Sequence, residues 1–130
     1  MSQIPKDLRY TPEHEYLKPT PAKDVYVVGI TDYAQGELGD VVFVELPAVG
    51  RELGRMETFG TIEAVKAVSD LYSPAKGKVV EVNTKLADDP SVVNSDPYGA
   101  GWMIKLQVSD PGEVGKLLDA GGYGSHLGEG

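Results

Sequence analysis

Short β-branched runs, each closed by glycine, proline or a turn-forming polar residue, constrain the fold of this chain most. They cover residues 25–30, 40–46, 58–65, 67–72, 78–83 and 103–108. Runs of this length, separated by such breakers, predict a β-sandwich or β-barrel. Glycine and proline supply 16 and 9 of the 130 residues without any low-complexity tract, which indicates many tight turns rather than disorder.

Helices are expected to be few and short. The pattern predicts one from residue 32 to 38, capped by Thr31 or Asp32 and ended by Gly39. Asp89 before Pro90 predicts a second helix that ends near residue 94, and residues 112–120 predict a third, stopped by the glycines at 121 and 122. No linker divides the chain, so we expect one mostly β domain over residues 1–130, with a flexible tail after about Tyr123.

Composition excludes several classes of function. The chain has no cysteine, so disulfides, thiolate metal sites and a cysteine nucleophile are absent. Its 20 acidic residues against 12 lysines and arginines give a net charge of −8, which argues against a nucleic-acid partner because phosphate binding needs clustered cations. No stretch approaches the roughly 18 apolar residues of a membrane span, and residues 1–9 resemble no targeting segment, so no membrane partner is expected.

The sequence also lacks the usual constellations of an enzyme. Its two histidines, His14 and His126, are too few for an ordinary zinc site, and neither a nucleophile elbow nor a glycine-rich phosphate loop is present. Residues 13–15, Glu-His-Glu, leave open a small metal-binding or catalytic β-domain as an alternative. We therefore expect a protein that is not an enzyme, with no metal site.

Lys66 lies between two strand-like runs, at the predicted tip of a β-hairpin. A lysine there would present its amine on a flexible four-carbon stem, away from any core. Solvated lysines are common in turns, so this position alone does not establish a role. The turn carries neither Asn-Gly nor Asp-Gly, the favoured pairs of two-residue hairpin loops.

The residues around Lys66 resemble a known modification site. Residues 63–67, Glu-Ala-Val-Lys-Ala, followed by 69–74, Ser-Asp-Leu-Tyr-Ser-Pro, are similar to the lipoylation site of glycine cleavage system H proteins. Segments 10–16, 29–35, 38–47, 77–83 and 94–102 resemble the same family in order and spacing. The resemblance runs from about Tyr10 to Tyr123, nearly the whole chain.

This resemblance implies a lipoyl/biotinyl-carrier-like fold, a barrel-sandwich hybrid with a few short peripheral helices. It also implies that Lys66 carries covalently bound lipoic acid in a non-catalytic carrier. The implied partners are a pyridoxal-phosphate glycine decarboxylase, a tetrahydrofolate-dependent aminomethyltransferase, dihydrolipoamide dehydrogenase and lipoylating enzymes. The expected location is the bacterial cytoplasm, or the mitochondrial matrix for a mature eukaryotic form.

Three further residues acquire expected roles, Glu15 and Asp70 from the resemblance and Glu63 from its position before Lys66. Glu15 and Asp70 match positions that hold the aminomethyl-loaded lipoyl arm in a surface cleft, where carboxylates would attract its amine. Glu63, three residues before Lys66, is expected to be read by the lipoylating enzyme, although it could equally be an edge-strand charge that favours solubility.

Two alternatives keep the same fold. A biotin carrier is disfavoured because Lys66 lies between Val65 and Ala67 rather than between methionines. A lipoyl relay protein, which donates its lipoyl group to other complexes, would have an identical attachment site.

Overall fold

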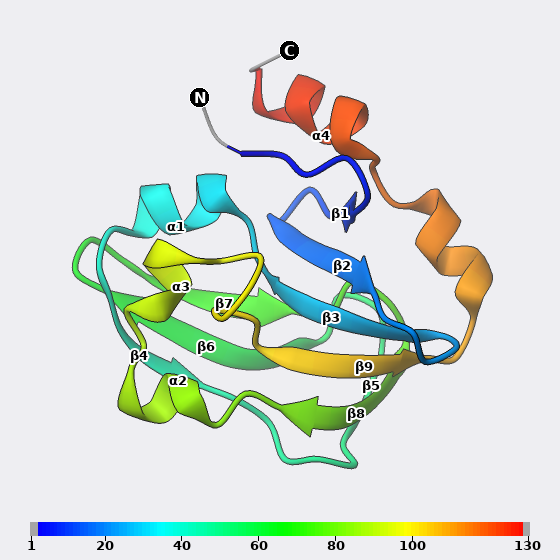
Figure 1. Cartoon of the computed structure of the whole chain (residues 1–130), viewed down its shortest axis with the longest axis horizontal. Coiled ribbons are helices and arrows are strands. Elements are labelled where there is room, and N and C mark those ends of the chain that lie inside the picture. Colours follow the sequence, from blue (N-terminus) through cyan, green and yellow to red (C-terminus); the bar gives the residue numbers. More distant parts are fainter. Residues whose placement is uncertain (1–2, 129–130) are drawn as a thin grey trace.

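Two antiparallel sheets form the framework of the computed structural model, which describes residues 3–128 (Figure 1). The six-stranded sheet contains, in spatial order, β1 (Arg9–Tyr10), β2 (Glu15–Pro19), β3 (Val25–Ile30), β9 (Ile104–Val108), β8 (Gly77–Val82) and β5 (Glu52–Leu53). The three-stranded sheet contains β4 (Val41–Glu45), β6 (Thr58–Ala64) and β7 (Val68–Tyr72). The predicted runs are therefore strands, and the expectation of a mostly β fold is confirmed.

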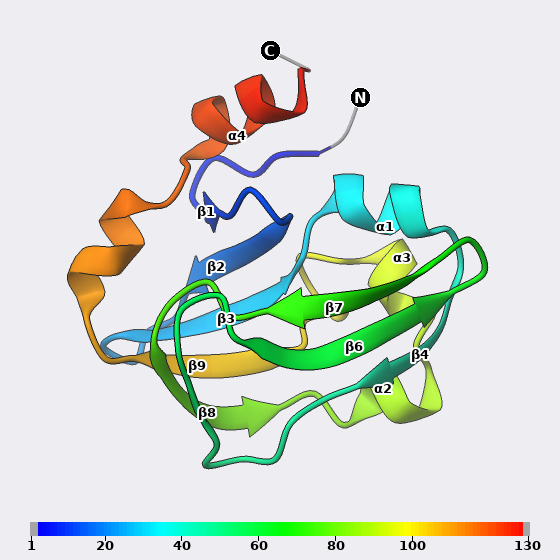
Figure 2. The same ribbon diagram turned by 180° about the vertical axis from the view of Figure 1, so that it is seen from behind.

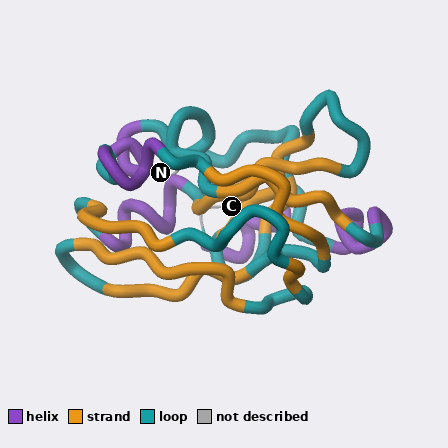
Figure 3. Tube along the Cα trace, turned by 90° about the horizontal axis from the view of Figure 1, so that it is seen from below, coloured by secondary structure: helices purple, strands orange, loops and turns teal. Residues whose placement is uncertain are grey.

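One hydrophobic core joins the two sheets. It takes buried side chains from both of them, among which are Val28, Ile104 and Leu106 from the larger sheet and Val44, Ile62 and Leu71 from the smaller one. Seen from below, the strands run across the molecule in layers, with most of the helices toward its two ends (Figure 3). Alternation along the smaller sheet leaves one face in the core and the other in solvent.

The first predicted helix is confirmed as α1 (Asp32–Leu38). Thr31 caps it, because its hydroxyl accepts a hydrogen bond from the backbone N–H of Ala34. Gly39 ends it with a φ of +80° and a ψ of −159°, a conformation essentially reserved for glycine. Cap chemistry read from the sequence was sufficient here because both signals act within the helix itself.

The second predicted helix is wrong in its bounds. The helix found there, α3 (Val92–Ser95), begins two residues later than expected and has Ser91 rather than Asp89 at its N-cap position. A further single-turn helix, α2 (Lys85–Asp88), was not expected, and Asp89 ends it. Asp89 has a non-helical backbone, with φ −140° and ψ 74°. Proline disfavours helical geometry in the residue before it, so Pro90 separates the two turns.

The C-terminal prediction also needs correction. Residues 111–116 form a 3₁₀ helix, η1 (Pro111–Lys116), and an α-helix, α4 (Ala120–Leu127), begins where the third helix was expected to end. Asp119 caps α4 by accepting a hydrogen bond from the backbone of Gly122, so the glycines lie inside its first turn. The chain after Tyr123 is thus helical to Leu127; its flexibility stays a prediction, and residues 129–130 lie outside the described part.

Helix α4 lies beside the N-terminal segment, above the edge of the larger sheet (Figures 1 and 2). Backbone hydrogen bonds join Leu118 and Tyr10, with N···O distances of 2.8 and 2.9 Å, so the chain before α4 pairs with β1. A small second hydrophobic cluster, built on Leu8, Tyr10, Tyr16 and Tyr123, anchors this end. No helix within residues 3–128 is long and apolar enough to cross a membrane.

Candidate functional site

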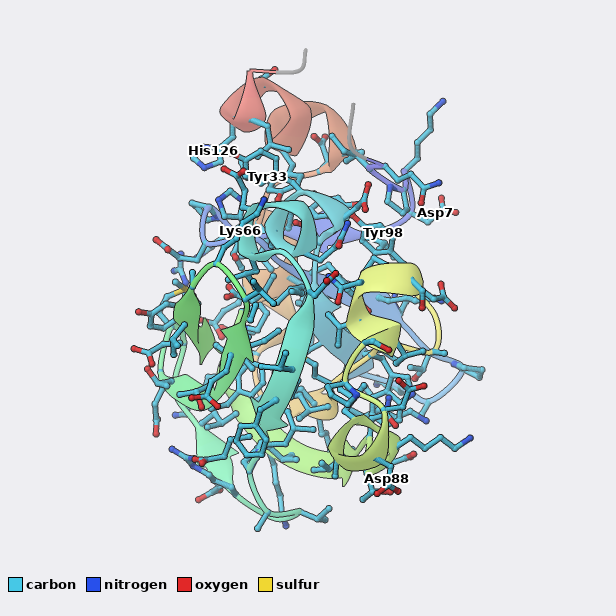
Figure 4. All side chains as sticks on the ribbon, turned by 90° about the vertical axis from the view of Figure 1, so that its left-hand side faces the viewer. Asp7, Tyr33, Lys66, Asp88, Tyr98 and His126 are labelled. Atoms are coloured by element: carbon cyan, nitrogen blue, oxygen red, sulfur yellow. The ribbon has the colours of Figure 1, made fainter. Side chains whose placement is uncertain are left out.

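The predicted hairpin between β6 and β7 is present, and Lys66 lies in its turn. Glu63 pairs with Val68, and the N–H of Ala64 donates to the carbonyl of Ala67 at 2.9 Å, which leaves Val65 and Lys66 as the two loop residues. Both are exposed. The hairpin reaches to the end of α1, where Lys66 is seen at the tip (Figures 2 and 4).

The end of α1 holds this turn through backbone hydrogen bonds. The N–H of Lys66 donates to the carbonyl of Leu38 at 3.2 Å, and the N–H of Val65 donates to the carbonyl of Asp40 at 2.9 Å. Gly39, between these two acceptors, has no side chain to obstruct the lysine. A Cβ atom there would lie 3.2 Å from Cγ of Lys66 and 3.4 Å from its Cε. The aliphatic stem therefore rests on Gly39.

A cleft of about 250 Å³ opens beside the hairpin. Its walls are the turn before β2, helix α1 and strands β6 and β7. Its lining residues are Glu13, His14, Glu15, Ile30, Tyr33, Ala34, Glu37, Leu38, Ile62, Ser69, Asp70 and Leu71. Leu38, whose carbonyl binds the Lys66 amide, is one of them, so the cleft begins next to the hairpin tip. The fold thus brings Glu15 and Asp70 to the same cavity, beside Lys66.

Glu15 is a buried member of this cleft, with only 2% of its surface exposed. Its Oε1 accepts a hydrogen bond from the hydroxyl of Thr11 at 2.8 Å, and its Oε2 accepts a longer one of 3.4 Å from the N–H of Tyr72. Burial outweighs these bonds and raises the pKa of Glu15 to about 8. The carboxyl group is therefore largely protonated at pH 7, and a cation placed beside it would favour its ionised form.

Asp70 and Glu63 are exposed residues of the hairpin strands. Asp70, on β7, lines the cleft. Glu63, on β6, is not among the residues that line it, although the strand register places Glu63 and Asp70 on the same outward face of the sheet. Phe43 of β4 and Val68 of β7 flank it in the same row of the sheet. Of the four residues singled out from the sequence, Glu15 and Asp70 line the cleft, Lys66 lies beside it at the hairpin tip, and Glu63 is not among its lining residues.

Comparison with known families decides what this arrangement belongs to. A family model described as "Glycine cleavage H-protein" matches residues 8–129. The chain belongs to this family. The biotin carrier considered from the sequence is therefore the wrong family.

Whole-length relatives agree. The chain is 55% identical over 130 residues to the glycine cleavage system H protein of Symbiobacterium thermophilum, with 100% of both chains covered. It is 51% identical over 123 residues to that of Carboxydothermus hydrogenoformans, covering 95% of this chain and 93% of the relative. The crystal structure of an H protein from Mycobacterium marinum superposes with a TM-score of 0.86 at 44% identity, covering 96% of this chain and 99% of the other.

The cleft contains residues that sequence reasoning did not place there. His14, considered only as a metal ligand or a surface residue, lines it together with Tyr33 and Glu37 of α1. His14 has a φ of +73°, a conformation uncommon outside glycine, so the turn before β2 is tightly specified. No local pattern marks these residues, because they meet only when α1 folds over the start of β2.

The three residues of the Glu-His-Glu motif all line the cleft but are not placed to hold a metal ion together. Glu13 is exposed whereas Glu15 is buried. Among residues 3–128, no group of three or more histidine, cysteine, aspartate or glutamate side chains is placed to hold a metal ion.

Proposed function

We propose that this chain is the non-catalytic lipoyl carrier of the glycine cleavage system, with Lys66 as its attachment site. One observation carries the proposal: in a member of the H-protein family, the exposed hairpin lysine stands next to a cleft whose lining includes the carboxyl groups of Glu15 and Asp70. The geometry suits presentation of a tethered group more than catalysis by side chains.

The residues around Lys66 suit a lipoyl group. Its amine is exposed for amide formation, and its stem has room over Gly39. The cleft combines apolar side chains, such as Ile30 and Leu71, with the carboxyl groups of Glu15 and Asp70, which suits an aliphatic arm with a cationic cargo. When bound, the lipoyl disulfide accepts the aminomethyl group reductively and is later regenerated by oxidation.

Glu15 and Asp70 would hold the loaded arm in the cleft. Arrival of an ammonium group beside Glu15 lowers the pKa of this buried carboxyl, so the residue loses its proton and forms a charge-assisted pair. Asp70, at the exposed side, contributes attraction that solvent weakens. The cleft would also exclude water from a labile adduct.

The partners follow from the family. They are glycine decarboxylase, which loads the carrier, the tetrahydrofolate-dependent aminomethyltransferase, which unloads it, and dihydrolipoamide dehydrogenase, which reoxidises it. The net charge of −8 would steer the chain toward basic surfaces on these enzymes. Because the relatives named above are bacterial, we place the chain in the cytoplasm.

Intact-mass analysis tests the attachment site. Native protein is expected to carry a lipoyl mass increment, and Lys66→Arg is expected to lack it. Lys78→Arg, at an exposed lysine on β8, is the matched control and should retain the increment. An increment that persists in Lys66→Arg would refute the assignment.

The cleft and Glu63 can be tested together. Glu15→Ala and Asp70→Ala should shorten the half-life of the aminomethyl-loaded protein without slowing lipoylation. Glu63→Ala should instead slow lipoylation and leave the half-life of the loaded protein unchanged, because Glu63 lies outside the cleft. An unchanged half-life in both cleft variants would contradict the holding role, and an unchanged lipoylation rate in Glu63→Ala would contradict recognition through that residue.

The lipoyl relay alternative shares the attachment site, so it stays a prediction of the sequence. Reconstitution with glycine, decarboxylase and aminomethyltransferase distinguishes the two functions. A carrier of glycine cleavage supports turnover of glycine, whereas a dedicated relay supports only transfer of lipoyl groups to other complexes.

A further inference from the structure

The hydroxyl group of Tyr123 connects two walls of the cleft from behind. Tyr123 lies on α4 and is completely buried. Its oxygen is 2.8 Å from Nδ1 of His14, in the turn before β2, and 2.7 Å from Oγ1 of Thr31, the cap of α1. The ring is held by stacking on Tyr10, with centroids 4.6 Å apart and planes 8° from parallel. Helix α4 therefore contacts, through Tyr123, the elements that form the cleft, although it contributes no lining residue.

The direction of these hydrogen bonds follows from the donors available. Thr31 Oγ1 accepts from the N–H of Ala34 at 3.2 Å, so its own hydrogen can be donated to Tyr123. The hydroxyl of Tyr123 then donates to His14, which requires an unprotonated Nδ1. A protonated His14 would donate from Nδ1 to the Tyr123 oxygen, which reverses the direction of both hydrogen bonds. The Tyr123 hydroxyl would then donate to Thr31, and the hydroxyl hydrogen of Thr31 would lose Tyr123 as its acceptor. The network thus favours neutral imidazole with its hydrogen on Nε2.

The surroundings of His14 act in the same direction. Burial lowers the pKa of His14, and His126 on α4, with ring centroids 5.9 Å apart, lowers it further. Glu13 in the same turn and Glu37 on α1 oppose this shift. Tyr33 of α1 faces the imidazole at a centroid distance of 5.0 Å. Figure 4 shows His126 and Tyr33 at the same end of the molecule as Lys66.

We propose that Tyr123 is a positioning residue of the cleft, whose single hydroxyl holds His14 as a neutral imidazole protonated on Nε2 and locks α1 to the turn that carries Glu15. This role rests on the proposed function of the cleft. A neutral His14 adds no positive charge beside Glu15, so nothing from this residue repels a cationic cargo. The α1 anchor keeps the opposite wall of the cleft in place.

The wild-type protein without lipoate provides the first test. Nitrogen NMR of ¹⁵N-labelled histidine should show His14 as the Nε2–H tautomer, titrating below the usual histidine pKa of about 6.5. A Nδ1–H tautomer, or a charged His14 at neutral pH, would overturn the proposal whether or not any variant folds.

Tyr123→Phe provides the second test, and Tyr16→Phe is its control. Tyr16 is equally buried, and its hydroxyl donates to the carbonyl of Pro97 at 2.6 Å, away from the cleft. Both variants should lose a similar amount of thermal stability. Only Tyr123→Phe should mix the tautomers of His14 and shorten the half-life of the loaded protein several-fold.

Three results would each overturn the positioning role: an unchanged His14 tautomer in Tyr123→Phe, equal changes of tautomer and adduct half-life in both variants, or a mixed tautomer with an unchanged half-life. Failure of the proposed cleft function can be distinguished from failure of the Tyr123 proposal. It would leave the half-life unchanged in Glu15→Ala and Asp70→Ala, whereas the His14 tautomer is read in protein without lipoate and does not depend on that result.

Discussion

Two of the walls of the cleft, the turn before β2 and the β6–β7 hairpin, are built in opposite ways. The turn before β2 holds its functional groups by burial and side-chain hydrogen bonds, from Thr11 to Glu15 and from Tyr123 to His14. The β6–β7 hairpin leaves Lys66 and Asp70 exposed and is held to the end of α1 by backbone hydrogen bonds alone at its tip.

This difference gives the two walls different roles. A buried carboxyl group responds strongly to an approaching charge, because the surrounding dielectric is low and its protonation is coupled to folding. Exposed groups on a backbone-anchored hairpin can be offered to several partners without altering the core. The following experiments test whether stability and presentation are separated in this way.

Glu15→Gln should produce the largest change, in the pH dependence of stability. Burial raises the pKa of Glu15 from 4.5 to about 8, so the folded state binds more protons than the unfolded state between these values. The free energy of unfolding therefore falls as pH rises through this window, by a few kcal/mol at most. Glutamine has no proton to lose, so the variant should gain relative to wild type from pH 5 to pH 8.

Urea unfolding at both pH values measures this difference. Glu63→Gln, on the exposed face, is the control and should follow the wild-type pH dependence. If Glu15→Gln leaves the pH dependence of the free energy of unfolding as it is in the wild type, burial does not govern the protonation of Glu15.

Gly39→Ala should have the next largest effect, on the docking of the hairpin. With φ +80° and ψ −159°, alanine is strained by about 1–3 kcal/mol, and its methyl group would press on Cγ of Lys66. We expect lower stability in urea and slower lipoylation. Gly36→Ala, inside α1 with no atom within 4 Å of the added carbon, should instead stabilise by up to about 1 kcal/mol. Equal effects at the two glycines would rule out a special role for Gly39.

Asp70→Asn should change stability least, within about 0.5 kcal/mol, because the side chain is exposed. The half-life of the loaded protein should nevertheless fall, since one carboxylate at the cleft is lost. Thermal unfolding and adduct decay, measured on the same preparation, separate the two. A marked loss of stability would show that side chains of the hairpin contribute to stability as much as those of the turn before β2. The proposed difference between the two walls would then be wrong.

Much of the fold and part of the site could be read from the sequence because the relevant forces are local. Alternation and breakers predict the strands, Thr31 and Gly39 bound α1, and the hairpin places Lys66 at a tip. Proline geometry is local too, but its competition with the capping tendency of Asp89 was resolved only in the folded chain, where Asp89 ends α2 and α3 begins at Val92.

The sequence by itself determined the mostly β architecture, the family and the lysine that the fold presents, since each depends on residues close together in the chain or on an ordered set of motifs. The tertiary structure alone decided the burial of Glu15 and the contact between His14 and Tyr123, which are 109 residues apart. Burial and long-range hydrogen bonds arise from which segments meet when the core forms. No pattern within a segment records them, and here they set the protonation of the cleft.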